Sequence, residues 1–273
     1  MSTDSTAARA NRDIARNAII HDELAWRYDA IHGEIFNQVE QARLAALLAR
    51  AKAEVRGCPE PLAALDFGCG SGNLARHLLA LGMVVMAADV SRGFLNLVAS
   101  RYPGVTTHWM ESGDTAGLAD ASFDFVATYS VLHHIPDYLA ACAELARVCR
   151  PGGVVVIDHE PSEGYWLDDP AYAAFCRKTL RFDWRKYLTL NNYWHRMRRL
   201  FDPRHSNEGD IHVWPDDHVE WPKVSAVMVA HGLEPVIEED YLLARKLYRP
   251  DIYARHVDRL SDTRVMVFRK CAA

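Results

Sequence analysis

The chain has 273 residues, of which 49% are hydrophobic and 25% charged, a composition typical of a globular protein that needs no metal or disulfide to fold. Its formal net charge of -5 argues against a nucleic-acid partner, and it contains no apolar run of the roughly 18 residues that span a bilayer. Six cysteines without a C-x-x-C pair argue against a zinc ribbon or a disulfide framework and favour a cytoplasmic location.

The N-terminal region is expected to be helical after a short tail. Residues 1–12 are polar and lack an apolar segment, so we expect a disordered tail followed by a single domain over residues 13–273. Residues 13–61 have apolar residues near the helical period, which predicts two helical segments with a break at Gly33.

Short apolar runs then alternate with helical stretches. Continuous apolar strands between helices are typical of a sheet covered on both faces, which predicts a doubly wound, mostly parallel α/β fold. The expected strands are residues 62–67, 83–88, 105–110, 123–129 and 154–157, and the expected helices are residues 73–81, 94–101 and 138–148.

The pattern changes after Asp158. Residues 159–220 are rich in aromatic and charged residues and show no strand alternation, so we interpret them as a helical insertion that caps the substrate site. Residues 221–273 resume the regular pattern with a helix and two strands, an antiparallel edge pair that brings the sheet to about seven strands.

A glycine-rich turn joins the first expected strand to the next helix. Gly68, Gly70 and Gly72 let the backbone turn sharply and let a ligand approach the main chain. The sixth position of the motif is Asn73 instead of a third close-packing glycine, which disfavours the dinucleotide clamp of a nicotinamide dehydrogenase without ruling it out. Asp89 ends the second strand, where a carboxylate accepts hydrogen bonds from ribose hydroxyls in either enzyme class.

Six segments in chain order resemble motifs of the class I S-adenosylmethionine-dependent methyltransferases, in the small-molecule, type 11 branch. They extend over about residues 62–158. The segments are residues 66–72 (DFGCGSG), 88–91 (ADVS), 113–118 (GDTAGL), 122–126 (SFDFV), 132–137 (LHHIPD) and 145–153 (LARVCRPGG).

The resemblance implies S-adenosylmethionine as the cofactor and assigns residues around its methionine part. Asp66 would interact with the cofactor's amino group, and Gly68 and Gly70 would let the methionine part lie over the turn. Ser130 would lie beside the sulfonium. Tyr28 would help an N-terminal helical lid close the pocket, although it also fits a core aromatic residue of an amphipathic helix.

The resemblance also assigns residues to the adenosine part. Asp89 would hold the ribose hydroxyls, with Val90 against adenine. Asp114 would accept the adenine amino hydrogen, and Thr115 would assist through its backbone.

Methyl transfer is an in-line displacement that needs a base only when the acceptor must lose a proton. His133 and His134 follow the fourth strand, and His159 and Glu160 follow the fifth, at the edge of the sheet where ligands bind. The alternative is structural, with one of the paired histidines capping the next helix and the other packing against the sheet.

Residues 177–204 contain nine Lys or Arg and two acids, a net charge of +7 that leaves -12 on the rest of the chain. This segment fits a solvated basic face, a lid for an anionic substrate, or a basic amphipathic surface in weak contact with a membrane. Between the last two we favour the lid, so neutralising Arg196, Arg198 and Arg199 should raise the KM for the acceptor. The nine basic residues are Arg177, Lys178, Arg181, Arg185, Lys186, Arg196, Arg198, Arg199 and Arg204.

The leading hypothesis is therefore a cytoplasmic methyltransferase with a small-molecule acceptor, for which the lid interpretation of residues 177–204 favours an anion. Aminocarboxypropyl transfer or cyclisation of the cofactor, a non-catalytic partner subunit and a nicotinamide dehydrogenase remain as alternatives. His205, His212 and His218 match no known ligand spacing, so no metal is expected. The sequence makes no prediction of the oligomeric state.

Overall fold

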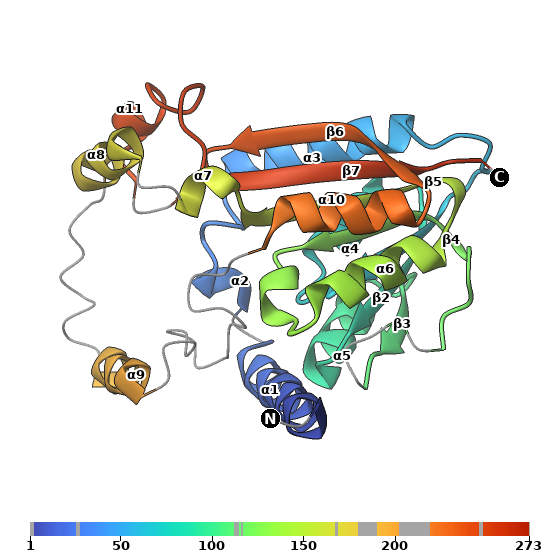
Figure 1. Ribbon diagram of the computed structural model, residues 1–273, viewed down its shortest axis with the longest axis horizontal. Coiled ribbons are helices and arrows are strands. Elements are labelled where there is room, and N and C mark those ends of the chain that lie inside the picture. Colours follow the sequence, from blue (N-terminus) through green and yellow to red (C-terminus); the bar gives the residue numbers. More distant parts are fainter. Residues whose placement is uncertain are drawn as a thin grey trace.

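The computed structural model describes residues 3–25, 28–111, 115, 117–166, 169–179, 190–201, 219–245 and 248–272. Its centre is a seven-stranded sheet in the order β3-β2-β1-β4-β5-β7-β6 (Figure 1). The first five strands are parallel, and β7 is antiparallel to both β5 and β6. The strands are β1 (Ala63–Phe67), β2 (Val84–Asp89), β3 (Thr106–Trp109), β4 (Phe123–Tyr129), β5 (Cys149–Pro161), β6 (Leu233–Tyr241) and β7 (Thr263–Lys270).

Helices cover both faces of the sheet, which explains its nearly continuous apolar strands. Successive side chains of a strand point to opposite faces. Val154 and Val156 accordingly pack with α3, α4 and α5, whereas Val155 and Ile157 pack with α6 and α10. These helices are α3 (Gln38–Ala53), α4 (Asn73–Ala80), α5 (Arg92–Arg101), α6 (Tyr138–Val148) and α10 (Trp221–Ala230).

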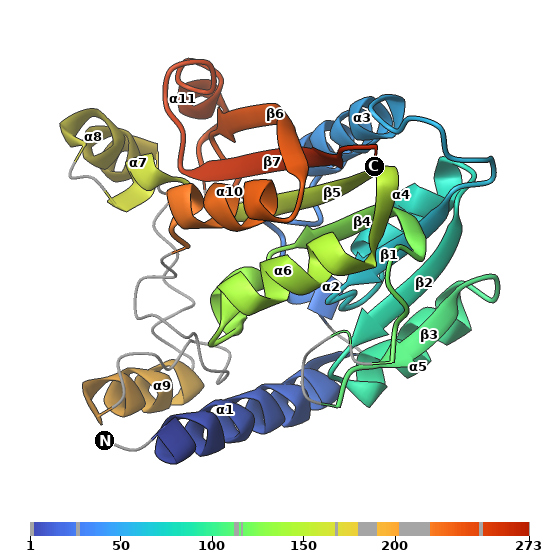
Figure 2. The same ribbon diagram turned by 45° about the vertical axis from the view of Figure 1, so that its right-hand side comes forward.

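Helices at one end of the molecule come from the expected insertion and from the C-terminal region. α8 (Pro170–Thr179) packs with α11 (Pro250–Tyr253) around the buried Phe175, next to α7 (Glu163–Trp166) (Figure 2). α9 (Leu190–Phe201) lies between two segments outside the described residues. Within the described part, no helix is both long and apolar enough to cross a membrane.

The doubly wound fold is confirmed, and so is the antiparallel pair at the end of the sheet. The expected end of the fifth strand is wrong, because β5 continues to Pro161 through a bulge between Ile157 and Glu160 that brings residues of the expected insertion into the sheet.

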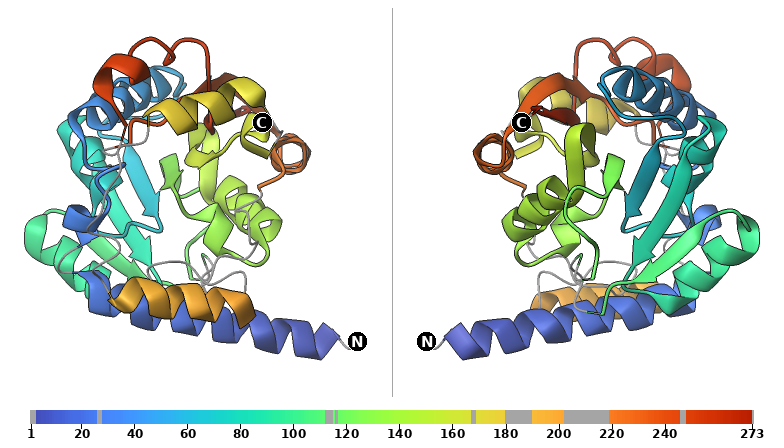
Figure 3. Two further views of the ribbon diagram at one scale, coloured as in Figure 1. Left: turned by 90° about the vertical axis from the view of Figure 1, so that its left-hand side faces the viewer. Right: turned by 90° about the vertical axis from the view of Figure 1, so that its right-hand side faces the viewer.

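The expected disordered tail over residues 1–12 is wrong as well, because helix α1 (Thr3–Leu24) begins at Thr3. The stretch contains Ala7, Ala8, Arg9 and Ala10, whose high helix propensity extends the helix toward the N-terminus. Among the described residues, the region ahead of β1 holds three helices instead of two, with the short α2 (Tyr28–Ile31) before the expected break at Gly33. α1 runs across the end of the molecule and contacts α5 (Figure 3).

The order of the strands reverses at β1, which lies between β2 and β4. Beside such a reversal the loops after adjacent strands diverge and leave a crevice at the carboxyl ends of the strands. The glycine turn follows β1 directly, so the fold places it at this crevice.

Candidate functional site

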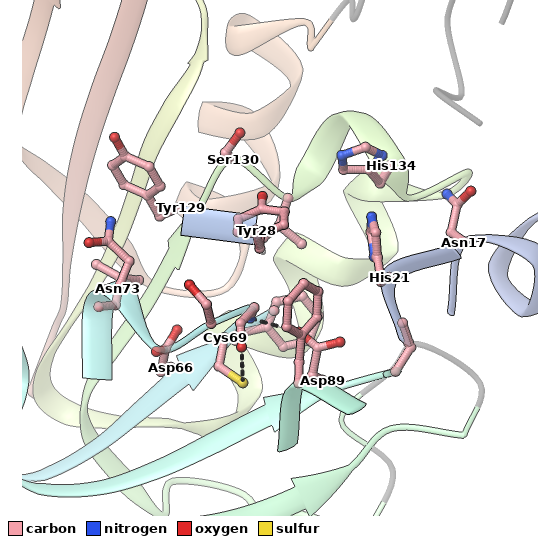
Figure 4. A pocket seen from close by; sticks show the side chains of 18 of the residues that line it. Asn17, His21, Tyr28, Asp66, Cys69, Asn73, Asp89, Tyr129, Ser130 and His134 are labelled. Carbon is pink, nitrogen blue, oxygen red and sulfur yellow. Dashed lines mark hydrogen bonds between the residues drawn. The ribbon is translucent and has the colours of Figure 1, made fainter. Parts of the chain in front are cut away.

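A pocket of about 980 Å³, including its open mouth, lies at the carboxyl ends of β1, β2 and β4. The glycine turn after β1 forms its floor, and α1 and Tyr28 border it on the side of the N-terminal helices (Figure 4). The predicted site residues that line it are Tyr28, Asp66, Gly68, Gly70, Asp89, Val90, Ser130 and His134.

The glycine turn adopts a conformation that requires glycine at Gly68. The residue has φ +71°, and its N–H donates to the carbonyl of Ala88 at 2.8 Å. A Cβ at this position would lie 2.5 Å from Cγ2 of Val131, closer than carbon atoms pack. The turn after β1 and the turn after β4 therefore fit together only without a side chain at Gly68.

Asp66 is fully buried at the end of β1 and faces the pocket. Its Oδ2 accepts the N–H of Ala75, in the first turn of α4, at 2.9 Å. Its Oδ1 has no hydrogen-bond partner among the described residues. Burial raises the pKa of this carboxyl group to about 8, and the charge of Asp89 adds to the shift.

Asp89 connects the second strand to the glycine turn. Its Oδ2 accepts the N–H of Gly70 at 2.9 Å, and its Oδ1 accepts the N–H of Ser91 at 2.8 Å. Each carboxylate oxygen has a second lone pair, so both can still accept a hydrogen bond from a ligand hydroxyl. Burial raises the pKa of Asp89, whereas its two backbone hydrogen bonds lower it.

The other residues predicted to contact the adenosine part of the cofactor do not all line the pocket. Val90 lines the pocket, together with Met110 at the end of the third strand. Thr115 is buried and donates through Oγ1 to Glu144 at 2.5 Å, and its side chain does not line the pocket. Asp114 lies outside the described residues.

Of the paired histidines, His134 lines the pocket and His133 does not. Nδ1 of the buried His133 lies 2.8 Å from Oε2 of Glu160. The other oxygen of Glu160 accepts the N–H groups of Val131 and Leu132 at 2.8 and 2.7 Å. The fully buried Glu160 thus holds the turn that carries His134, which makes it a positioning group for the pocket.

His159 also lies behind the pocket wall and does not line it. Its ring stacks on Tyr129 with the centroids 4.5 Å apart, and its φ of +64° belongs to the bulge in β5. Burial lowers the pKa of His159 well below its usual range, and the nearby Arg43 lowers it further. The structure therefore separates the candidate bases and leaves His134 as the one that faces the pocket.

Comparison with known proteins shows which family the chain belongs to. A profile of the methyltransferase domain family matches residues 65–157. An uncharacterised methyltransferase of Mycobacterium tuberculosis is 34% identical over 94 residues, 34% of this chain and 48% of that protein. A demethylmenaquinone methyltransferase of Beutenbergia cavernae is 30% identical over 186 residues, which cover 67% of this chain and 74% of the relative. The chain belongs to the class I S-adenosylmethionine-dependent methyltransferases. It spans about half the length of the first curated relatives that it matches.

Solved methyltransferases share the fold at low sequence identity. The magnesium protoporphyrin IX methyltransferase of Synechocystis, solved with S-adenosylhomocysteine, has a TM-score of 0.56 and 16% identity, covering 95% of this chain and 99% of the other. An S-adenosylmethionine-dependent methyltransferase of Mesorhizobium loti has a TM-score of 0.51 and 20% identity, covering 82% and 98%. The seven-stranded architecture is thus that of methyltransferases.

S-adenosylmethionine is the cofactor of this family, and the pocket of this methyltransferase fits it. Three buried polar atoms around the glycine turn lack a hydrogen-bond partner among the described residues: Oδ1 of Asp66, Oγ of Ser71 and Nδ2 of Asn73. An acceptor and two groups able to donate suit the amino and carboxylate groups of the cofactor's methionine part. Among the described residues, no group of three His, Cys, Asp or Glu could hold a metal, and His205, His212 and His218 lie outside them.

Helix α1 supplies pocket residues that the sequence did not single out. Ile14, Asn17 and His21 line the pocket, and the ring of His21 lies 5.8 Å from that of His134. Their spacing of three and four residues places them on one helix face, and this was the only signal available. A face that carries Ile, Asn and His does not reveal that it covers a cofactor.

Asp22 fastens α1 to the methyltransferase core. Its Oδ1 accepts the hydroxyl of Ser91 at 2.5 Å and the N–H of Gly93 at 2.8 Å, both at the N-terminus of α5. Asp22→Ala removes both hydrogen bonds and exposes the pocket more often, so we expect S-adenosylmethionine to dissociate about tenfold faster, the effect of one or two hydrogen bonds. Stopped-flow displacement measures this rate, and hydrogen exchange reports the loosening of α1.

Asp22→Asn is the matched control, because its amide oxygen can still accept from both donors. We expect it to change the dissociation rate by less than about threefold, the range of one partly retained hydrogen bond. Equal dissociation rates for the wild type and Asp22→Ala would show that Asp22 does not hold α1 over the pocket.

Proposed function

We propose that this protein transfers the methyl group of S-adenosylmethionine to a small-molecule acceptor and releases S-adenosylhomocysteine. The observation that carries the proposal is that His134 and Ser130 line the same pocket as the glycine turn. The cofactor supplies an already activated methyl group, so the chain has to bind and orient two ligands and exclude water.

The position of α1 favours a small acceptor over a macromolecule. Ile14, Asn17 and His21 enclose the pocket from outside the sheet, next to His134. A protein or nucleic-acid acceptor would have to displace this helix, whereas a small molecule fits within the pocket. The charge of the whole chain, -5, also disfavours nucleic acid.

His134 is the group proposed to remove a proton from the acceptor where the chemistry requires it. We expect His134→Gln to lower the rate of S-adenosylhomocysteine formation at least about a hundredfold, the usual contribution of general base catalysis. The affinity for S-adenosylmethionine should stay the same. His231→Gln changes a histidine at the end of α10, outside the pocket lining, and should retain full activity. An unchanged rate of S-adenosylhomocysteine formation in His134→Gln would show that His134 does not act as a general base.

We also propose that the acceptor carries an anionic group. The net charge of +7 over residues 177–204 supports it, and Arg177, Lys178 and Arg198 are exposed in the described part of that segment. A net positive charge attracts an anion and raises its local concentration near that segment. Replacing Arg177 and Lys178 by glutamine should then raise the KM for the acceptor and leave the affinity for S-adenosylmethionine unchanged.

The function is tested by incubating the purified protein with S-adenosylmethionine and a panel of phenols, carboxylic acids and amines. Demethylmenaquinone, the compound in the name of the Beutenbergia relative, belongs in the panel. Release of S-adenosylhomocysteine with a gain of one methyl group on an acceptor is the expected result. Methylthioadenosine would instead indicate aminocarboxypropyl transfer or cyclisation, and cofactor binding without any product would favour a partner subunit.

A further inference from the structure

Helix α9 exposes a concentration of large apolar side chains. Tyr193, Trp194 and Met197 are exposed, as are Leu200 and Phe201, with 76% and 86% of their surface accessible. In the described part of the chain, the other exposed large apolar residues are scattered singly over six other elements, which is normal for a protein surface. A cluster within a single 12-residue helix indicates a binding surface.

The sequence of α9, LNNYWHRMRRLF, separates into two faces. At about 100° per residue, its apolar residues occupy a continuous arc of about 120° and its polar residues occupy the opposite side. Position 198 lies at one border of the apolar arc and position 196 at the other. Arg198 is exposed, and its guanidinium lies 5.3 Å from the ring centroid of Trp194.

The charge of α9 favours an anionic surface as its partner. The helix contains three arginines and no Asp or Glu. The chain outside residues 177–204 has a net charge of -12, so an anionic surface would repel the rest of the molecule and attract this segment. A second copy of the same helix is disfavoured, because two apolar faces bordered by arginine would bring like charges together.

We propose that α9 docks on the surface of an anionic lipid bilayer and lies in its interface plane. Trp and Tyr prefer the boundary between headgroups and acyl chains, where an apolar ring can carry a polar edge. Arg198, at the border of the apolar arc, can reach a lipid phosphate while its stem covers apolar surface. The inference goes beyond the proposed methyl transfer and does not depend on the acceptor.

The proposal is tested by flotation of the full chain with large unilamellar vesicles. One set contains phosphatidylcholine with about 30% phosphatidylglycerol, and the other contains phosphatidylcholine alone. The wild type should bind the anionic vesicles at least about tenfold more strongly, and the difference should shrink in high salt. Leu200→Glu with Phe201→Glu should abolish binding to both. Arg196→Gln and Arg198→Gln together should lower binding to anionic vesicles about 25-fold, since each arginine near the surface contributes roughly fivefold.

Val229→Glu is the matched control, because Val229 is an exposed apolar residue on α10. It should bind vesicles like the wild type. All variants should bind S-adenosylmethionine normally, because no residue of α9 lines the pocket in the described part of the chain, and this also verifies that they fold. Failure of the wild type to bind anionic vesicles would overturn the proposal. Loss of self-association or a higher acceptor KM in Leu200→Glu/Phe201→Glu, without vesicle binding by the wild type, would identify α9 as a dimer contact or a lid instead.

Discussion

Gly68→Ala should weaken binding of S-adenosylmethionine at least about a hundredfold, equivalent to about 3 kcal/mol. The new methyl group would lie 2.5 Å from Cγ2 and 2.8 Å from Cγ1 of Val131. Val131 cannot move away easily, since its N–H donates to the buried Glu160. The turn after β1 would have to shift instead, and with it Gly70, whose N–H donates to Asp89. Calorimetric titration of the folded variant with S-adenosylmethionine measures the loss.

Gly82→Ala separates this effect from backbone strain alone. Gly82 has φ +77°, close to that of Gly68, but a Cβ there meets nothing within 4 Å. The control should lose about 1 kcal/mol of folding stability, the usual penalty for alanine in the left-handed region, and keep its cofactor affinity. If the affinity of Gly68→Ala for S-adenosylmethionine also stays within about threefold of the wild type, the glycine turn does not bind the cofactor.

Asp66→Asn should have opposite effects on stability and binding. The carboxyl group titrates near pH 3.9 in the unfolded chain, and burial raises its pKa to about 8 in the folded protein. Between these values the unfolded chain releases the proton and the folded protein retains it. Asp66 therefore destabilises the cofactor-free protein increasingly as the pH rises from about 4 to about 8, where the cost levels off.

The neutral amide removes this pH dependence and can still accept the N–H of Ala75. Without cofactor, the Tm of Asp66→Asn should exceed that of the wild type by several degrees at pH 8, which corresponds to a gain on the order of 2 kcal/mol in the free energy of unfolding. At pH 5 the difference should be much smaller. Its affinity for S-adenosylmethionine should fall roughly 30-fold, because a charge-assisted hydrogen bond is lost. Thermal denaturation at the two pH values, together with titration, tests both parts. A lower Tm at pH 8 would show that Asp66 serves the fold instead of the ligand.

The sheet could be predicted from the sequence because its strands are buried on both faces. A run such as residues 123–129 is apolar except for Asp124 and Thr128, and all seven residues of β4 are buried. The antiparallel end of the sheet also followed from the pattern. The length of β5 did not, because its bulge places the polar residues His159 and Glu160 inside the strand.

The roles around the pocket could be predicted only in part. Local sequence places His133 and His134 at the end of the fourth strand, but it does not show which of them faces the pocket. That depends on Glu160, which holds His133 across a distance of 27 residues in sequence. The contribution of α1 depends in the same way on a long-range contact, that of Asp22 with the N-terminus of α5.

Binding of the cofactor product tests the central claim most directly. We expect the purified chain to bind one S-adenosylhomocysteine with a micromolar or lower Kd in a calorimetric titration. We expect no binding of NAD under the same conditions, because Asn73 takes the place of the third glycine of a dinucleotide clamp. Binding of NAD, or no binding of S-adenosylhomocysteine by the folded protein, would contradict the assignment of this pocket.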